Sequence, residues 1–132
     1  MKKIILFLFM STAALVACAQ SATKADTIKG TQQTAAQVLK KVESGKAYLI
    51  DVRTPEEYQA GHLAHAQNIN IKSGNFKQQV SKLDKNKPVY LYCRSGNRSG
   101  QAADSLNTLG FKTYYNIGGF EQLKAAGLPP AK

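Results

Sequence analysis

Residues 88–106 read Pro88-Val-Tyr-Leu-Tyr-Cys93-Arg-Ser-Gly-Asn-Arg98-Ser-Gly-Gln-Ala-Ala-Asp-Ser-Leu106, and the rest of the chain is organised around them. The first five residues are apolar or aromatic and predict a buried strand over 88–92. From Ser99 the apolar residues recur at helical spacing, and Gly110 is typical of a helix end. The pattern therefore predicts a strand, a tight loop and a helix, with a cysteine at the carboxyl end of the strand.

The setting of this cysteine favours its thiolate. A helix N-terminus presents unpaired N–H groups and about half a positive charge. Gly96 and Asn97 tolerate a positive φ, so the loop can turn its N–H groups inward. Arg94 and Arg98 add two cations. Because these groups lower a cysteine pKa from its free value of about 8.5, we expect Cys93 to be a nucleophile and not a buried structural thiol.

The loop resembles the active-site loop of rhodanese-type sulfurtransferases, in which a catalytic cysteine follows a central strand and opens a six-residue loop. Four further stretches are similar to landmarks of that family, in its usual order: Asp51-Val-Arg-Thr-Pro-Glu-Glu-Tyr58, Gly61-His-Leu63, Ala66-Gln-Asn-Ile69, and Gly118-Gly-Phe120 followed by Ala126-Gly-Leu-Pro129. The resemblance covers about residues 34–130. It implies a rhodanese-like three-layer α/β sandwich, with a mostly parallel central sheet flanked by helices.

Strand and helix patterns alternate along the same region, as such a sandwich requires. The predicted strands are 47–52, 67–71, 88–92 and 112–117. The predicted helices begin at Gln33 or Thr34, after Thr54, at Ser73 or Asn75, at Ser99 and at Phe120. Ligands of parallel sheets bind beyond the carboxyl ends of the strands, which is where the pattern places Cys93.

The resemblance implies that Cys93 is catalytic and carries sulfur as a persulfide. The donor would be a small anion such as thiosulfate, the acceptor a thiol or cyanide, and no cofactor would be needed. The implied substrate-binding residues complete the loop: Arg94, Ser95, Gly96, Asn97, Arg98 and Ser99. The implied structural residues near the site are Asp51, Arg53 and His62. We expect His65 to be exposed, at a position where the family commonly has glycine, and no metal site at either histidine.

Two other functions are compatible with a cysteine loop. Related phosphatases and arsenate reductases cradle tetrahedral oxyanions in a similar loop, but they place five residues between cysteine and arginine. Here four residues separate Cys93 from Arg98, which makes a smaller nest. A persulfide carrier or interaction module, loaded only by a protein partner, is the second alternative. Turnover of thiosulfate and cyanide distinguishes an enzyme from such a carrier.

The N-terminal segment predicts export. Lys2 and Lys3 precede an apolar run of 13 residues, which is too short to span a membrane and fits a signal peptide over residues 1–17. Leu15-Val-Ala-Cys18 resembles a bacterial lipobox, which implies lipidation at Cys18 and a lipid-anchored protein facing the periplasm, with the outer membrane favoured. Plain cleavage after Ala19, giving a soluble periplasmic protein, is the alternative. Both leave Cys93 as the one free thiol.

Two further features of the sequence are a polar segment before the domain and a high positive net charge. Residues 18–33 are mostly small or polar and predict a flexible tether before a single domain over 34–130. The chain has 132 residues and a net charge of +10, which can steer anionic molecules toward the site. Its lysines are scattered and do not alternate with aromatic residues, so we expect no nucleic-acid partner. We expect a monomer.

Overall fold

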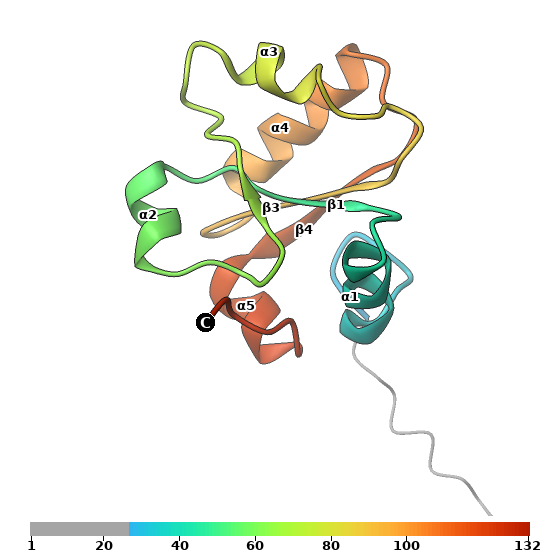
Figure 1. Ribbon diagram of the computed structural model, residues 1–132, viewed down its shortest axis with the longest axis vertical. Coiled ribbons are helices and arrows are strands. Elements are labelled where there is room, and N and C mark those ends of the chain that lie inside the picture. Colours follow the sequence, from blue (N-terminus) through green and yellow to red (C-terminus); the bar gives the residue numbers. More distant parts are fainter. Residues whose placement is uncertain (1–26) are drawn as a thin grey trace, which may run out of the picture.

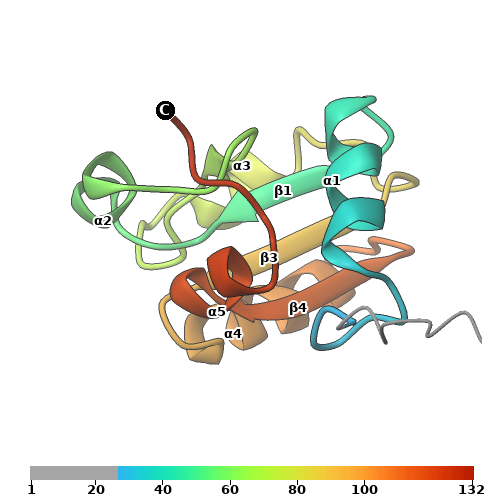
Figure 2. The same cartoon turned by 90° about the horizontal axis from the view of Figure 1, so that it is seen from below.

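The computed structural model describes residues 27–132, in which helices cover both faces of a four-stranded sheet (Figure 1, Figure 2). All strand pairs are parallel, in the order β2-β1-β3-β4. The elements in chain order are α1 (Ala35–Glu43), β1 (Tyr48–Asp51), α2 (Pro55–Ala60), β2 (Gln67–Asn68), α3 (Phe76–Val80), β3 (Val89–Cys93), α4 (Asn97–Thr108), β4 (Tyr114–Gly119) and α5 (Phe120–Ala125). This arrangement confirms the predicted α/β sandwich.

The core has two halves, one on each face of the sheet. Side chains of a strand alternate between faces, so β3 contributes Tyr90 and Tyr92 to the half under α1 and α5. The residues that alternate with them along β3, Leu91 and Cys93, belong to the half under α3 and α4. All five β3 residues are buried, as expected for a central strand of a parallel sheet. The site cysteine therefore points toward the helix that follows it.

Two helices begin where their capping residues predict. Thr34 accepts the N–H of Gln37 and receives the Gln37 side chain on its own N–H, which is a complete capping box. Thr54 and Glu57 form the same arrangement at α2, with Pro55 at the first helical position. The predicted cap of α3 is weaker, because Asn75 makes no side-chain capping hydrogen bond.

Several predicted boundaries shift. Helix α4 begins at Asn97 and not at Ser99, so Arg98 lies in its first turn. Strand β4 runs two residues further than predicted, to Gly119, and pairs with β3 through an irregularity at Ile117, since Leu91 pairs with Asn116 and Tyr92 with Gly118. Strand β2 has only two residues, although the N–H of Ile69 still bonds the carbonyl of Asp51 at 2.9 Å.

The structure also moves the start of the domain. Residues 27–33 belong to the folded unit, although their composition predicts a tether. Ile28 is only 2% exposed and packs in the core, and Thr27 pairs with Thr34 in an isolated bridge. The side chain of Gln33 accepts the hydroxyl of Tyr90 at 2.7 Å. The folded unit therefore includes residues 27–33.

The predicted signal peptide, Cys18 and the rest of the predicted tether lie outside the described residues. Among residues 27–132, no helix has the length and apolar character needed to cross a membrane.

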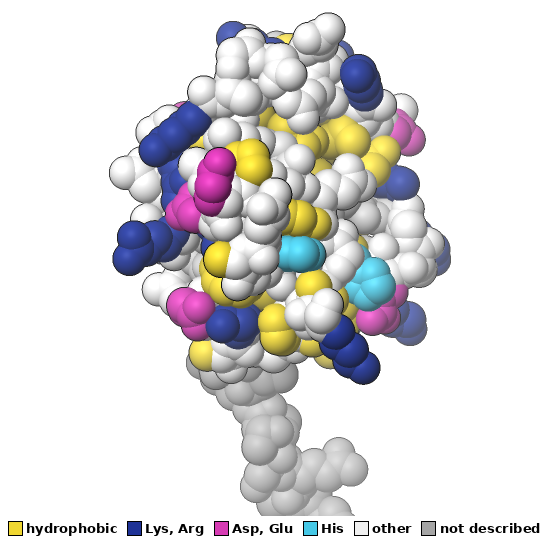
Figure 3. All heavy atoms as spheres, turned by 60° about the vertical axis from the view of Figure 1, so that its left-hand side comes forward, with side chains coloured by type: hydrophobic (Ala, Val, Ile, Leu, Met, Phe, Trp, Pro, Cys, Tyr) yellow, Lys and Arg dark blue, Asp and Glu magenta, His cyan; other side chains and the backbone are white. Residues whose placement is uncertain are grey.

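The surface matches the scattered charge pattern of the sequence. On the face shown in Figure 3, lysine and arginine side chains are interspersed with acidic and uncharged groups.

Candidate active site

Cys93 ends β3 at the point where the chain turns into α4. The loop between these elements comprises only Arg94, Ser95 and Gly96, and Gly96 caps the helix with φ +96°. This left-handed conformation favours glycine, and the N–H of Gly96 itself bonds the cysteine sulfur. The Cys93 side chain is buried, with 1% of the residue exposed. The prediction of a thiol held in a tight loop at a helix N-terminus is confirmed.

Hydrogen bonds to the sulfur set its acidity. The N–H of Gly96 lies 3.0 Å from Cys93 Sγ, and the hydroxyl of Ser99 lies 3.4 Å from it. Burial is the largest single influence and raises the pKa of Cys93. The Ser99 hydroxyl, together with the N–H groups of Ser99, Ser95 and Gly96, outweighs burial and lowers the pKa below its ordinary value. The loop therefore favours a thiolate nucleophile.

A glycine of β4 allows the loop to lie against the sheet. A Cβ atom on Gly119 would stand 2.5 Å from the carbonyl oxygen of Arg94, closer than side-chain atoms approach. Gly118 and Gly119 are both part of β4. Their lack of side chains is what lets the cysteine loop pack on this strand.

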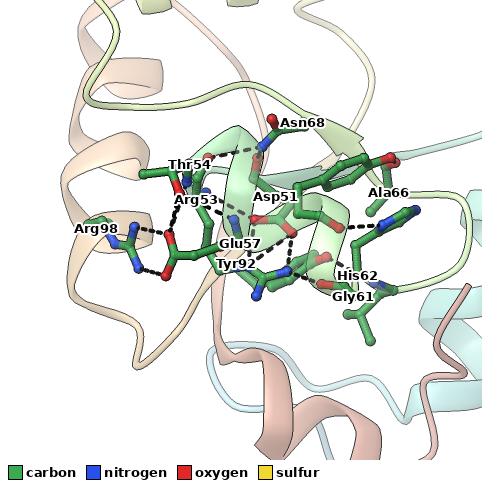
Figure 4. A network of polar contacts seen from close by, with 12 residues as sticks. Asp51, Arg53, Thr54, Glu57, Gly61, His62, Ala66, Asn68, Tyr92 and Arg98 are labelled. Carbon is green, nitrogen blue, oxygen red and sulfur yellow. Dashed lines mark hydrogen bonds and ion pairs between the residues drawn. The ribbon is translucent and has the colours of Figure 1, made fainter.

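The two loop arginines differ in their surroundings. Arg98 donates to both carboxylate oxygens of Glu57, at 2.7 and 2.8 Å, in a bidentate ion pair (Figure 4). Its hydrogen bonds, and those of Thr54, outweigh burial and lower the pKa of Glu57 to about 2. Arg98 is thus held by α2. The sequence pattern indicated that Arg98 is a cation near Cys93, but it did not indicate the partner. Arg94 is exposed.

Two hollows flank the loop, and Arg94 and Glu57 line both. The first has a volume of about 450 Å³ and is also lined by Arg53 and Phe120. The second has a volume of about 530 Å³ and is also lined by the remaining polar loop residues and their neighbours: Thr54, Lys72, Ser95, Asn97, Arg98 and Gln101. Four of the six predicted substrate-binding residues, Arg94, Ser95, Asn97 and Arg98, therefore face one open space. Gly96 and Ser99 instead contact the sulfur.

Asp51 and Arg53 form a buried ion pair beneath the first hollow (Figure 4). The guanidinium donates to Asp51 at 2.7 Å and to the carbonyl of Gly61 at 2.6 Å. It lies 4.5 Å from the ring centroid of Phe120. Asn68 donates to the carbonyls of both residues of the pair. The pair thus ties β1, α2 and β2 together, as the predicted structural role requires.

The histidines have ordinary structural surroundings. The His62 ring stacks on Tyr58 with centroids 3.7 Å apart, and its Nδ1 lies 2.8 Å from the Tyr58 carbonyl oxygen. His65 is exposed and has φ +66°, in keeping with a position where the family commonly has glycine. Within residues 27–132, no three His, Cys, Asp or Glu side chains are grouped so that they could hold a metal ion.

Two functional neighbours of the loop were not identified from the sequence. Glu57 lies in the first turn of α2, and helix capping alone is enough to explain an acidic residue there. Asn116 lies in β4 and bonds both Ser99 and Gly96. A signal for Asn116 existed, because a polar residue inside an otherwise apolar strand needs partners.

Comparisons with known proteins agree with this geometry. A sequence model of the rhodanese-like domain matches residues 34–126. Thiosulfate sulfurtransferase PspE of Escherichia coli is 40% identical over 83 residues, which cover 63% of this chain and 77% of PspE. YqhL of Bacillus subtilis is 45% identical over 78 residues, which cover 58% of this chain and 60% of YqhL. A solved rhodanese with anions from E. coli is 39% identical with a TM-score of 0.53, and the match covers 65% of this chain and 98% of that structure.

Proposed function

Because the chain belongs to the rhodanese-like family, we propose that it transfers sulfane sulfur from a small anionic donor such as thiosulfate to a thiol or cyanide, through a persulfide on Cys93. The observation that carries this proposal is the sulfur of Cys93 at the centre of its loop, 3.0 Å from the N–H of Gly96. A relative that is 40% identical and is named a thiosulfate sulfurtransferase supports it.

The proposed reaction has two displacements at sulfur. The Cys93 thiolate attacks the outer sulfur of thiosulfate, so a new S–S bond forms while the S–S bond of the donor breaks. Sulfite leaves with the electron pair. Cyanide then attacks the outer sulfur of the persulfide, which forms thiocyanate and returns the thiolate. Charge and atoms balance without a proton, a metal or a redox partner, so the proposal includes no cofactor.

The residues around the sulfur have distinct proposed roles. The loop N–H groups stabilise the thiolate at Cys93 Sγ. The persulfide carries its charge on the outer sulfur, one bond further along, where the N-terminus of α4 and the remaining loop N–H groups would stabilise it. Arg94 is exposed and lines both hollows, so it can draw in an anionic donor. Arg98, paired with Glu57, holds the first turn of α4 in place and lines the second hollow.

Purified protein should turn over thiosulfate and cyanide in the steady state and should fail to hydrolyse a generic aryl phosphate. The loop leaves only three residues between Cys93 and α4, and the guanidinium of Arg98 in the first turn of α4 is already paired with Glu57. Thiocyanate formation and phosphate release measure the two activities. The matched control is the same chain with one glycine inserted between Gly96 and Asn97, which should weaken sulfur transfer.

Two outcomes would contradict this proposal. Phosphate release that exceeds sulfur transfer would assign the protein to the cysteine-loop phosphatases. Stoichiometric loading of Cys93 without turnover would identify a persulfide carrier that a protein partner must discharge.

The proposed location is the bacterial cell envelope, with a lipid anchor at Cys18. Replacing Cys18 by alanine leaves Ala17-Ala-Ala19 as a plain cleavage site, so export should continue without lipidation. The wild type should stay with membranes through a high-salt wash, which removes proteins held by charge alone, whereas Cys18→Ala should be soluble in the periplasm. Fractionation measures both. A soluble wild type whose N-terminus begins at Gln20 would replace lipidation by ordinary cleavage.

A further inference from the structure

Asn116 stands where β4 meets the cysteine loop. It pairs with Leu91 just before the irregularity of β4, and its side chain reaches both the loop and the first turns of α4. Its Nδ2 donates to the carbonyl of Gly96 at 2.8 Å. Its Oδ1 accepts the hydroxyl of Ser99 at 2.7 Å and the N–H of Gly118 at 3.2 Å. One side chain thus connects three parts of the site.

The surroundings of the amide fix its orientation. Gly96 offers a carbonyl, which can only accept, and Gly118 offers an N–H, which can only donate. The amide nitrogen of Asn116 must therefore face Gly96, and its oxygen must face Gly118 and Ser99. Gly100 leaves room for this arrangement, since a Cβ there would already lie 3.4 Å from Nδ2.

The hydroxyl of Ser99 has one hydrogen and two acceptors within reach. Asn116 Oδ1 lies 2.7 Å away and Cys93 Sγ lies 3.4 Å away. Ser99 is fully buried, so water does not supply a further partner from solvent. When Cys93 is a neutral thiol, the Ser99 hydroxyl can donate its hydrogen to Asn116 Oδ1 while its oxygen accepts the S–H group of Cys93. When Cys93 is a thiolate, the Ser99 hydroxyl forms a stronger hydrogen bond by turning to the charged sulfur.

We propose that Asn116 is a positioning residue for the sulfur chemistry, which competes with Cys93 Sγ for the single hydrogen of the Ser99 hydroxyl. The proposal deepens the sulfur transfer proposed above and rests on it only where activity is measured. The competition withholds part of the stabilisation that Ser99 gives the thiolate. A thiolate that is stabilised too strongly is a weaker nucleophile. By limiting this stabilisation, Asn116 preserves the reactivity of Cys93.

Other groups near the sulfur remain in place when Asn116 is changed. The carbonyl of Gly96 also accepts the N–H of Gly100 at 3.1 Å, so the loop conformation does not depend on Asn116 alone. The charged side chains that line the two hollows beside the loop come from the loop itself, α4, α2, α5 and the segments that follow β1 and β2. They are Arg94, Arg98, Glu57, Glu121, Arg53 and Lys72, and Asp51 is paired with Arg53. None of them is bonded to Asn116.

Two substitutions of Asn116 should shift the pKa of Cys93 in opposite directions. Asn116→Ala removes the competing acceptor, so Ser99 turns to the sulfur and the Cys93 pKa falls, by about half a unit. Asn116→Asp keeps the size of the side chain and loses only the hydrogen bond to the Gly96 carbonyl, which still accepts the N–H of Gly100. Its carboxylate binds the Ser99 hydrogen more strongly and adds a negative charge, so the Cys93 pKa rises by about one unit. Thiolate absorbance of the full chain against pH measures both, with the matching Cys93→Ser chain as the blank for Cys18 and the tyrosines.

The decisive test repeats both Asn116 substitutions in a chain that also carries Ser99→Ala. If Asn116 acts through Ser99, then Asn116→Ala no longer lowers the Cys93 pKa in the Ser99→Ala chain, and Asn116→Asp raises it by a smaller amount than before. The acid limb of the pH profile for sulfur transfer should move with the pKa in each chain. Tyr90→Phe is the control, because it removes a buried hydrogen bond from β3 on the opposite face of the sheet and should leave the Cys93 titration unchanged.

The proposal is overturned if both substitutions shift the pKa in the same direction, as general disruption of the site would. It is also overturned if the shifts are equally large without Ser99, as a purely through-space charge effect would give. Should Asn116→Ala fail to fold, the Asn116→Asp cycle decides alone. Thiolate titration needs no sulfur transfer. If the variants show the expected pKa shifts but the wild type does not turn over thiosulfate, the proposed function is refuted and this inference still stands.

Discussion

Replacing Cys93 by serine should remove thiocyanate formation and also the gain of one sulfur atom in mass after treatment with thiosulfate. The hydroxyl of serine does not ionise in the range where the thiol does, so the hydrogen bonds of Gly96 and Ser99 have no thiolate to stabilise. Serine also forms no persulfide. Because the substitution changes one buried atom for a smaller one that can accept the same hydrogen bonds, the fold should persist. Intact-mass spectrometry and steady-state assays measure the two losses.

Cys18→Ala is the matched control for this experiment, since it removes the other cysteine of the chain. It should keep both the turnover and the mass gain. Thiocyanate formation by Cys93→Ser at the wild-type rate would show that another group carries the sulfur, and the mechanism would then be wrong.

The cysteine loop could be predicted because its signals are local. A buried strand, a glycine that can adopt a positive φ and a helix start all lie within residues 88–106, and each is a property of neighbouring residues. The helix begins two residues earlier than its apolar pattern indicates, at Asn97, because the first turn of a helix at a site carries polar residues. Its apolar spacing therefore marks where packing begins and not where the helix begins.

The partners of the loop could not be predicted in the same way. Glu57 lies 41 residues before Arg98, and its position after Thr54 and Pro55 is fully explained by helix capping. A residue with one sufficient local explanation gives no sign of a second role. Asn116 lies 17 residues after Ser99, and the direction of its side chain depends on the irregularity of β4, which period-two patterning does not contain.

The start of the domain illustrates a different limit. Residues 19–33 have the composition of a linker, with Ile28 as their one large apolar residue. Composition describes an average over a segment, whereas burial of Ile28 and the bond from Tyr90 to Gln33 depend on two particular side chains. A polar segment can therefore belong to a folded domain through contacts of one or two side chains.

Arg53→Met should cost about 3–5 kcal/mol of folding stability, which is a large part of the 5–15 kcal/mol that a domain typically has. The substitution leaves the carboxylate of Asp51 at 0% exposure without its cation. It also leaves the carbonyl of Gly61 without the guanidinium that now donates to it at 2.6 Å. Denaturant unfolding at neutral pH, with the slope compared between variants, measures the loss.

The double substitution Asp51→Asn with Arg53→Met is the matched control, because it removes both charges. The amide oxygen at position 51 can still accept the backbone N–H of residue 53, as Asp51 does now. Most of the stability should return, since the cost of the single change comes mainly from an unpaired buried charge and not from the loss of the pair itself. A loss below about 1 kcal/mol in Arg53→Met would contradict the structural role, because exposed ion pairs contribute that little. Equal losses in the single and double variants would locate the effect in the packing of Arg53 on Phe120, where the guanidinium lies 4.5 Å from the ring centroid.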